Sequence, residues 1–173
     1  VVQAFKSNRR PPINVVPLKN VRVVLSSIEL TRLHDIETSK NPRTKPYLDD
    51  LNSWLRKTDH LLIWDYLTWY ENSLIPFPNF DNMASKAKFY AKKNVDGIFW
   101  EGDGGLPSFQ YRLRAYLAAK LLWNPAADVE FHTKEFCNFY YEEASSLMLI
   151  YLSELTKNKN NASDEIETGN NDF

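Results

Sequence analysis

The chain has few of the features that mark cross-linked, nucleic-acid-binding or membrane proteins. Its 173 residues include a single Cys, which excludes an internal disulfide framework and any Cys-rich zinc module. With 21 basic and 22 acidic side chains, the formal net charge is −1, and a dedicated nucleic-acid binder normally has a basic surplus. No apolar run approaches the ~20 residues of a membrane span, and the first residues lack a charged-then-apolar signal pattern. The sequence therefore predicts no nucleic-acid partner and no membrane span.

Aromatic residues, by contrast, are abundant. Five Trp, nine Tyr and ten Phe make up 14% of the chain, and an apolar fraction of 43% is enough for a packed core. Composition leaves two interpretations open. The aromatic side chains fill a core, or some of them line a site for flat apolar ligand faces such as sugar rings.

Strand and helix patterns alternate along the chain. β-Branched or continuous apolar runs predict strands at 1–5, 21–26, 61–67 and 95–100. Apolar stripes predict helices at 47–57, at 83–93 with Asp81 as N-cap, at 110–123, and over a long stretch from about 133 to 155 that is broken once. The Asn-rich, acidic stretch 157–173 is expected to be a disordered tail, which leaves 1–156 as one domain or part of a larger one.

This alternation predicts an α/β fold with parallel strands and right-handed crossovers. A closed barrel of eight strand–helix units needs about 250 residues, and only four strands are predicted here. The chain is therefore either a small open α/β sheet or the C-terminal half of a (β/α)8 barrel.

Acidic and aromatic side chains follow three of the predicted strands. Ligands of parallel α/β folds bind at the carboxyl ends of the strands, so these positions form the candidate site. The candidate catalytic carboxylates are Glu29, Asp65 and Glu101. The candidate substrate-binding residues are His34, Trp64, Tyr66, Trp69, Trp100 and Asp103. Because aromatic rings stack on sugars and paired carboxyls can cleave glycosidic bonds, the pattern indicates a carbohydrate-active site.

Each carboxylate also has an ordinary structural interpretation. Asp65 and Asp103 lie where a cap of the following helix would lie, and Glu29 could pair with Arg32 or Arg43 in a solvated loop. The Gly-rich loop 102–105 lacks both the Lys-Ser/Thr of a P-loop and the spacing of a dinucleotide fold, so no nucleotide cofactor is expected. No metal and no other cofactor is expected either.

Other conspicuous residues have simpler interpretations. His34, taken alone, fits a surface or hydrogen-bonded residue as well as a ligand-binding one. Trp54 and Trp123 fall on predicted helix stripes, which places both in the core. Cys137 is expected to be buried and inert on an apolar helix face.

Short motifs in a fixed order run from the N-terminus to about residue 155. They are Asn20-Val21-Arg22-Val23, Ile28-Glu29 followed by His34, Trp54, Trp64-Asp65-Tyr66, Pro76-Phe77-Pro78-Asn79, Gly97-Ile98-Phe99, Leu113-Arg114-Ala115-Tyr116-Leu117, Lys120-Leu121-Leu122-Trp123-Asn124-Pro125 and Tyr140-Tyr141. In this order the chain resembles the domain of unknown function numbered 4838, much of which is grouped as glycoside hydrolase family 163. The W-D-Y, P-F-P-N and K-L-L-W-N-P elements are specific when they occur together.

The resemblance implies a (β/α)8 barrel, of which this chain is the C-terminal half, and activity on glycans. Characterised members of the family are similar to endo-β-N-acetylglucosaminidases that cut within the chitobiose core of N-glycans, by a retaining mechanism. Carried across by position, Glu29, His34, Trp64, Asp65 and Tyr66 fall on matched family positions. The implied partner is a glycan or glycoprotein substrate, and the implied location is secreted, periplasmic or at the cell surface.

The chain departs from the family pattern at two places. Where the family often has two consecutive polar positions after its Gly-Val/Ile-Phe strand, this chain has Trp100-Glu101, so only Glu101 keeps a carboxylate. The usual Tyr-Tyr-Gly becomes Tyr140-Tyr141-Glu142, which alters a helix end.

Two alternatives to a working hydrolase stay open. One is a non-catalytic carbohydrate-binding or interaction module that uses the same aromatic strand ends. The other is a fragment that is inactive without its N-terminal half, because one of the catalytic pair lies outside this chain. Half a barrel leaves strand edges unpaired and an apolar face exposed, so we expect the chain to self-associate or to pack against its missing half.

Overall fold

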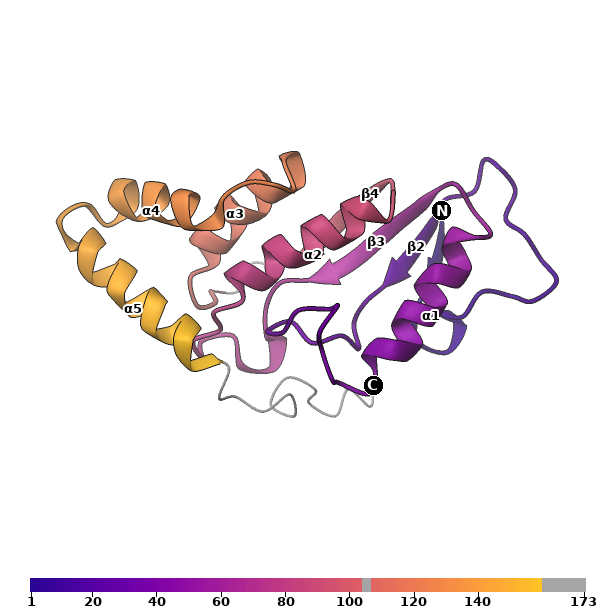
Figure 1. The fold of residues 1–173 in the computed structure, drawn as a ribbon, viewed down its shortest axis with the longest axis horizontal. Coiled ribbons are helices and arrows are strands. Elements are labelled where there is room, and N and C mark those ends of the chain that lie inside the picture. The colour runs from indigo at the N-terminus through magenta and orange to yellow at the C-terminus, as the bar shows by residue number, and fades with distance from the viewer. Residues whose placement is uncertain (104–106, 160–173) are drawn as a thin grey trace.

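The computed structural model describes residues 1–103 and 107–159 (Figure 1). The strands are β1 (Val2–Ala4), β2 (Val23–Ser26), β3 (Leu61–Tyr66) and β4 (Gly97–Glu101). The α-helices are α1 (Thr44–Leu55), α2 (Phe80–Lys92), α3 (Tyr111–Trp123), α4 (Val129–Tyr140) and α5 (Ser145–Asn158), with single 3-10 turns η1 (Lys6–Asn8), η2 (Tyr70–Asn72) and η3 (Glu142–Ala144). The four strands and the order of the elements agree with the sequence prediction.

The four strands form one open sheet in the order β1-β2-β3-β4, and every pair is parallel. The register sets Leu25 beside Ile63, and Ile63 beside Ile98. Strands β2, β3 and β4 are connected through α1 and α2, so the predicted α/β class of alternating strands and helices is confirmed.

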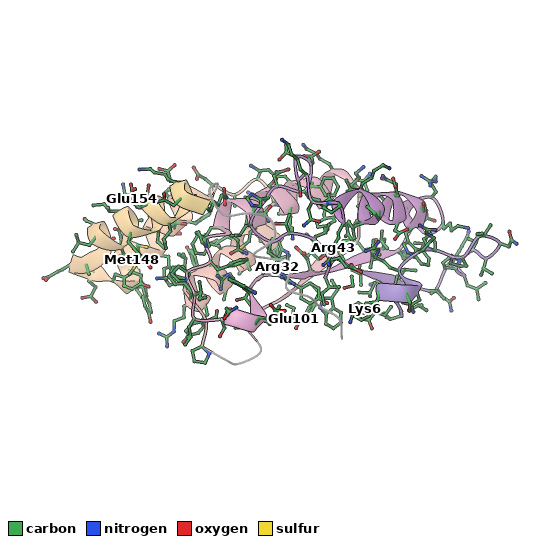
Figure 2. All side chains as sticks on the ribbon, turned by 90° about the horizontal axis from the view of Figure 1, so that it is seen from below. Lys6, Arg32, Arg43, Glu101, Met148 and Glu154 are labelled. Atoms are coloured by element: carbon green, nitrogen blue, oxygen red, sulfur yellow. The ribbon has the colours of Figure 1, made fainter. Side chains whose placement is uncertain are left out.

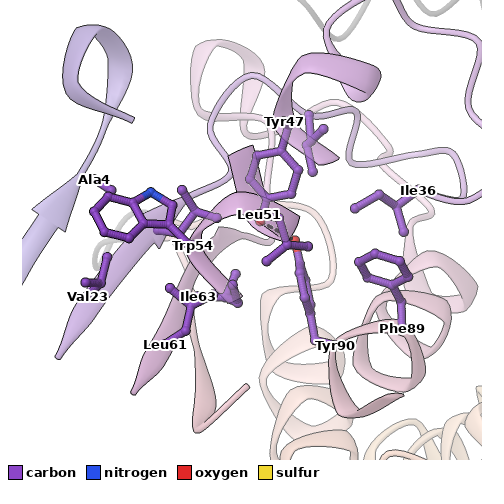
Figure 3. Close-up of a cluster of buried hydrophobic side chains, with 12 residues drawn as sticks. Ala4, Val23, Ile36, Tyr47, Leu51, Trp54, Leu61, Ile63, Phe89 and Tyr90 are labelled. Atoms are coloured by element: carbon purple, nitrogen blue, oxygen red, sulfur yellow. Dashed lines mark hydrogen bonds between the residues drawn. The ribbon is translucent and has the colours of Figure 1, made fainter. Parts of the chain in front are cut away.

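Helices α1 and α2 cover one face of the sheet (Figure 1). Successive strand side chains point to opposite faces, and Val23, Leu25, Leu61 and Ile63 point toward the helices. Figure 3 shows the aromatic side chains that pack against them: Tyr47, Trp54, Phe89 and Tyr90. The hydroxyls of Tyr47 and Tyr90 share a hydrogen bond of 2.8 Å, which satisfies both in a site closed to water. Trp54 is buried here, as predicted.

The other face of the sheet is covered by none of the described helices, and we call it the open face. Its residues alternate with those of the first face: Gln3, Val24, Ser26, Leu62, Trp64, Tyr66, Gly97, Phe99 and Glu101. Phe99 is 54% exposed, and Val24, Leu62 and Trp64 are partly exposed. An apolar sheet face in contact with solvent is what half of a closed barrel would present.

Helices α3, α4 and α5 pack in sequence beyond α2, and α4 and α5 form a V in Figure 1. Leu113, Leu117 and Leu121 of α3 face a second core with Cys137 of α4 and Leu152 of α5. The break expected in the long C-terminal helical region lies between Tyr140 and Ser145, and Cys137 is buried as predicted.

The prediction that Trp123 belongs to the core is wrong, because its side chain is 93% exposed. Leu121 occupies the buried face of α3, and Trp123 lies two residues further, about 200° around the helix. The helical periodicity therefore places this indole on the opposite side from the packed leucines.

Several helix ends also differ from the predicted ones. Helix α1 spans Thr44–Leu55 rather than 47–57, and α4 begins at Val129 rather than at about 133. Helix α2 begins at Phe80 rather than Met83, and its N-cap is Asn79 rather than Asp81. Helix α5 extends to Asn158, two residues into the stretch expected to be a tail. The rest of that expected tail, 160–173, lies outside the described residues.

Candidate functional site

The carboxyl ends of β3 and β4 bring Trp64 and Glu101 together on the open face. The indole Nε1–H of Trp64 donates to Oε2 of Glu101 at 2.7 Å, and the Trp64 ring meets Phe99 edge-on at 4.8 Å between centroids. Glu101 is partly exposed, so its carboxylate is held at one oxygen and still reached by solvent. A fixed but accessible carboxylate is suited to binding a hydroxyl or transferring a proton.

Two tyrosines and an arginine complete this arrangement. The ring of Tyr66 meets that of Tyr70 edge-on at 6.0 Å, and the Arg32 guanidinium lies 5.6 Å from the first ring and 5.9 Å from the second. The Tyr70 hydroxyl donates to the backbone carbonyl of Glu101 at 2.9 Å, and Tyr66 shares a hydrogen bond of 3.3 Å with Ser26. Figure 2 labels Arg32 and Glu101 in the middle of the molecule. We call this set the open-face cluster: Ser26, Arg32, Trp64, Tyr66, Tyr70 and Glu101.

Burial and charge both keep the tyrosines of the cluster protonated. Burial raises the pKa of Tyr70, and the negative charge of Glu101 raises it further. Burial also raises the pKa of Tyr66, although its hydrogen bond with Ser26 acts in the opposite direction. Both hydroxyls therefore stay neutral near pH 7 and can donate or accept hydrogen bonds.

Asp65 points to the helix-covered face instead. Its side chain is closed to solvent and accepts hydrogen bonds from Lys86 Nζ at 2.9 and 3.1 Å, from Trp100 Nε1 at 2.9 Å and from the Ser27 hydroxyl. Burial by itself would raise the pKa of Asp65, but the Lys86 ammonium and these hydrogen bonds outweigh it and hold the pKa below its usual value. The carboxylate is therefore ionised, fully bonded and out of reach of a substrate in this structure.

Glu29 is held on the side of α1. Its Oε2 lies 2.8 Å from Arg9 Nη1, and the same guanidinium donates through Nε to Asp50 at 2.8 Å. The Arg9 backbone carbonyl in turn accepts from the Trp54 indole at 2.7 Å. The alternatives that paired Glu29 with Arg32 or Arg43 do not match this geometry, because the partner is Arg9.

Asp103 follows β4 at one end of a cavity of about 580 Å³ beside α3. It accepts from the Ser108 hydroxyl, and the buried Arg114 guanidinium lies 3.7 Å away. Arg114 also donates to the Phe77 carbonyl at 3.2 Å and to Asn79 at 3.3 Å, so it ties the loop after β4 to the start of α2. Burial lowers the pKa of Arg114, and the Asp103 charge partly offsets this effect.

The two remaining predicted site residues, His34 and Trp69, make their contacts outside the open-face cluster. His34 lines a polar cavity of about 770 Å³ between the loop after β2, α2 and the end of α5. Trp69 precedes η2, where its indole donates to Glu71 at 3.4 Å and its ring lies 6.3 Å from that of Phe77. The structure thus brings together Trp64, Tyr66 and Glu101 from the predicted set, and Asp65 with Trp100 on the other face.

Comparison with known proteins identifies the family. Residues 2–153 match the model of the family described as "Domain of unknown function (DUF4838)". The chain belongs to this family. No curated protein and no solved structure matches it. The resemblance found from the motifs is therefore confirmed at the level of DUF4838, a family whose description names no activity.

In this DUF4838 chain the W-D-Y motif has two structural tasks. The motif is the end of β3, and its residues alternate between the faces of the sheet. Trp64 and Tyr66 belong to the open-face cluster, whereas Asp65 belongs to the packing between sheet and helices. One motif therefore contributes both to a surface that can receive a ligand and to the core that supports it.

Sequence reasoning missed four charged or aromatic residues of these networks. Lys86, Arg32, Tyr70 and Arg9 all contact predicted site residues. Lys86 had one available signal, because it lies three residues after Met83 and four before Tyr90 on the buried stripe of α2. The partners of Arg9 and Arg32 lie 20 residues or more away in the sequence, where spacing gives no signal.

Within 1–103 and 107–159, no group of three or more His, Cys, Asp or Glu side chains is placed to hold a metal ion. In the same ranges, no helix combines the length and apolar character needed to cross a bilayer.

Proposed function

We propose that this DUF4838 chain carries part of the active site of a glycoside hydrolase that acts on N-acetylglucosamine-containing glycans. The observation that supports it is the open-face cluster. One solvent-accessible carboxylate, Glu101, lies at a strand end among the rings of Trp64, Tyr66 and Tyr70. A carboxylate beside aromatic faces is the arrangement that sugar recognition uses.

Of the two catalytic carboxyls that a glycosidase needs, Glu101 is the one that this chain would supply. Trp64 donates to Oε2 of Glu101, which orients the carboxylate, and Oε1 remains for a sugar hydroxyl or a glycosidic oxygen. The partly exposed Trp64 and Tyr70 rings are available for stacking, while Arg32 lies behind Tyr66 and Tyr70 and keeps both in place.

The chain would act as half of a (β/α)8 barrel. Sequential strand order with α1 and α2 on one face supports this, because helices cover both faces of a doubly wound sheet. In the completed barrel the open face becomes the interior, and Glu101 lies at its carboxyl-terminal mouth. The second carboxyl comes from the other half, since Glu29 and Asp65 are held by Arg9 and Lys86.

A second candidate function is a non-catalytic carbohydrate-binding module. It is favoured by the separation of the carboxylates: among the described strand residues, Glu101 is the one carboxylate on the open face. Glycosidases need two carboxyls about 5–10 Å apart, so this chain alone would bind a glycan without cleaving it.

The test uses Glu101→Gln in a polypeptide that joins this chain to the other half of the barrel. Release of glycan from an N-glycosylated protein should fall by about 10²–10⁴-fold, the contribution of a general acid–base group, while binding of N,N′-diacetylchitobiose changes little. Lys88→Gln is the control, because Lys88 is exposed on α2, away from the cluster. Unchanged turnover in Glu101→Gln would exclude the catalytic role. If the unsubstituted polypeptide and the Glu101→Gln variant both bind the glycan and neither cleaves it, the result would support the carbohydrate-binding module.

A further inference from the structure

The ends of β3 and β4 carry the same two-residue pattern, an indole followed by a carboxylate. They are Trp64-Asp65 and Trp100-Glu101, and each indole donates to the carboxylate of the other strand. The bond from Trp64 to Glu101 is 2.7 Å long and lies on the open face. The bond from Trp100 to Asp65 is 2.9 Å long and lies on the helix-covered face, where the register sets these two residues side by side. The end of β4 is thus bonded to β3 through side chains on both faces.

The two bonds differ in their surroundings. On the covered face, Asp65 is also bound by Lys86 of α2 and by Ser27, the residue after β2, and all four side chains are buried. On the open face, Glu101 is partly exposed. The covered bond is therefore the rigid one, because its members have little freedom and no competing water.

We infer that Asp65 is a positioning residue that holds Trp100, and with it the end of β4, so that Glu101 meets Trp64 on the open face. The Asp65 carboxylate accepts hydrogen bonds from Ser27 after β2, from Trp100 in β4 and from Lys86 in the second turn of α2. Its side chain is closed to solvent, so it acts through Trp100 and not on a ligand directly. The significance of this for catalysis rests on the proposed function, whereas the geometric link between the two faces does not.

Charged and titratable groups surround both bonds, and Asp103 also acts on Tyr70 in the open-face cluster. Lys86 faces Asp65 from α2, with Tyr47 and Tyr90 further off, and Arg32, Tyr66 and Tyr70 face Glu101. Burial raises the pKa of each of these tyrosines, so they stay protonated in acid. In acid, therefore, none of these tyrosines changes its charge.

The experiment follows the indole N–H signals of the chain by two-dimensional ¹⁵N–¹H NMR, assigned with Trp→Phe variants. Lowering the pH then tests whether Asp65 is a fixed, ionised anchor. The Trp100 signal should stay in place over the range in which ordinary carboxyls titrate, roughly pH 3.5–5. A Trp100 signal that shifts within this range would overturn the inference, because Asp65 would then not be a fixed, ionised anchor.

Trp100→Phe tests the link between the faces, since it removes the N–H donor and keeps an aromatic ring. The Trp64 signal should move. Trp54→Phe is the matched control: it also removes a buried indole bond, to the Arg9 carbonyl, but lies on α1 and should leave the Trp64 signal unchanged. Asp65→Asn combined with Lys86→Gln removes both buried charges together and should reproduce the effect of Trp100→Phe. An unchanged Trp64 signal in both the Trp100→Phe and the double variant would contradict the inference.

Glycan binding separates this inference from the proposed function. If the chain binds N,N′-diacetylchitobiose, Trp100→Phe should weaken binding by about tenfold, the effect of one displaced hydrogen bond, and Trp54→Phe should not. Weakening by both variants alike would indicate a general loss of structure and overturn the positioning role. If the unsubstituted chain binds no glycan, the proposed function fails, and the indole signals alone still decide the inference.

Discussion

Several charged side chains of the described residues are buried, and three of them have specific sets of partners: Asp65, Lys86 and Arg114. Asp65 is 1% exposed and Lys86 3%, and they form an ion pair at 2.9 Å beneath the end of β3. Arg114, also 1% exposed, connects Phe77, Asn79 and Asp103. Buried charges of this kind are tolerated because every member has a partner, and they become costly when one partner is removed.

Lys86→Met should therefore lower the free energy of unfolding by about 3–5 kcal/mol, because it leaves Asp65 buried without its counter-charge. The measurement is urea unfolding at neutral pH. Lys88→Met on the exposed side of the same helix should change it by less than about 0.5 kcal/mol. Equal effects of the two substitutions would mean that the ion pair does not stabilise the fold.

The same pair predicts how stability depends on pH. Although burial acts to raise it, the pKa of Asp65 is held below its usual value by Lys86 and by the hydrogen bonds. Such a carboxyl contributes stability above its unfolded pKa of about 3.9, and this contribution is lost as pH falls toward the folded pKa. The free energy of unfolding should thus fall more steeply below about pH 4 in the unsubstituted chain than in the Asp65→Asn, Lys86→Gln variant. If the free energies of unfolding of the two proteins fell in parallel as pH is lowered, the ion pair would not be the origin of the pH dependence.

At the scale of secondary-structure elements, the alternation along β3 and β4 decides what each residue can do. Trp64 and Tyr66 share the open face with Glu101, whereas Asp65 and Trp100 face α2. Strand ends alone place all five at one edge of the sheet, but the side-chain period of two divides them between its faces. The link between α4 and α5 likewise depends on a local property, the backbone conformation of one residue.

This link contains Glu142, at the position where the motif resemblance implies a glycine. Glu142 follows the C-cap of α4 and has a φ of 47°, in the left-handed region that favours glycine. Glu142→Gly should raise the free energy of unfolding by about 1 kcal/mol, since the side chain no longer opposes this backbone conformation. The neighbouring Glu143→Gly, at a position without positive φ, should lower it by about 0.5–1 kcal/mol. Urea unfolding measures both, and the same sign for the two would count against the strain.

At the scale of the whole molecule, the sheet is the incomplete part. α1 and α2 cover one face, while the open face exposes Phe99 together with parts of Val24 and Leu62. Strands β1 and β4 are the two edges of the sheet, and each presents unpaired backbone groups to solvent. A surface of this kind is unfavourable in water unless another set of strands covers it.

The isolated chain should therefore self-associate in a concentration-dependent manner, as measured by light scattering coupled to size-exclusion chromatography. Phe99→Lys places a charge at the centre of the open face and should shift the chain toward monomer. Leu18→Lys is the control: Leu18 is 73% exposed in the loop before β2, off the sheet face, so its replacement should leave association unchanged. A monodisperse, cooperatively unfolding monomer at all concentrations would contradict the half-barrel proposal.

The sequence predicted the site only to the extent that it located the ends of the strands. Glu29, Asp65 and Glu101 were chosen because each lies at or just after the end of a predicted strand, and all three do lie at that edge. Their partners Arg9, Lys86 and Trp64 could not be paired with them in advance, because each pairing joins residues 20 or more positions apart. Trp123 failed for a simpler reason: an apolar residue on a helix was assigned to the core without following its angle around the axis.

The sequence by itself determined the α/β class, the four strands and the membership in DUF4838, because hydrophobic periodicity and ordered motifs are local signals. Only the tertiary structure decided which carboxylate remains accessible. Asp65 and Glu101 both follow a tryptophan near the end of a strand, and the order of residues does not distinguish them. The register of β3 against β4 turns one toward Lys86 and the other toward solvent, because adjacent positions of a strand point to opposite faces and only one face is covered by helices.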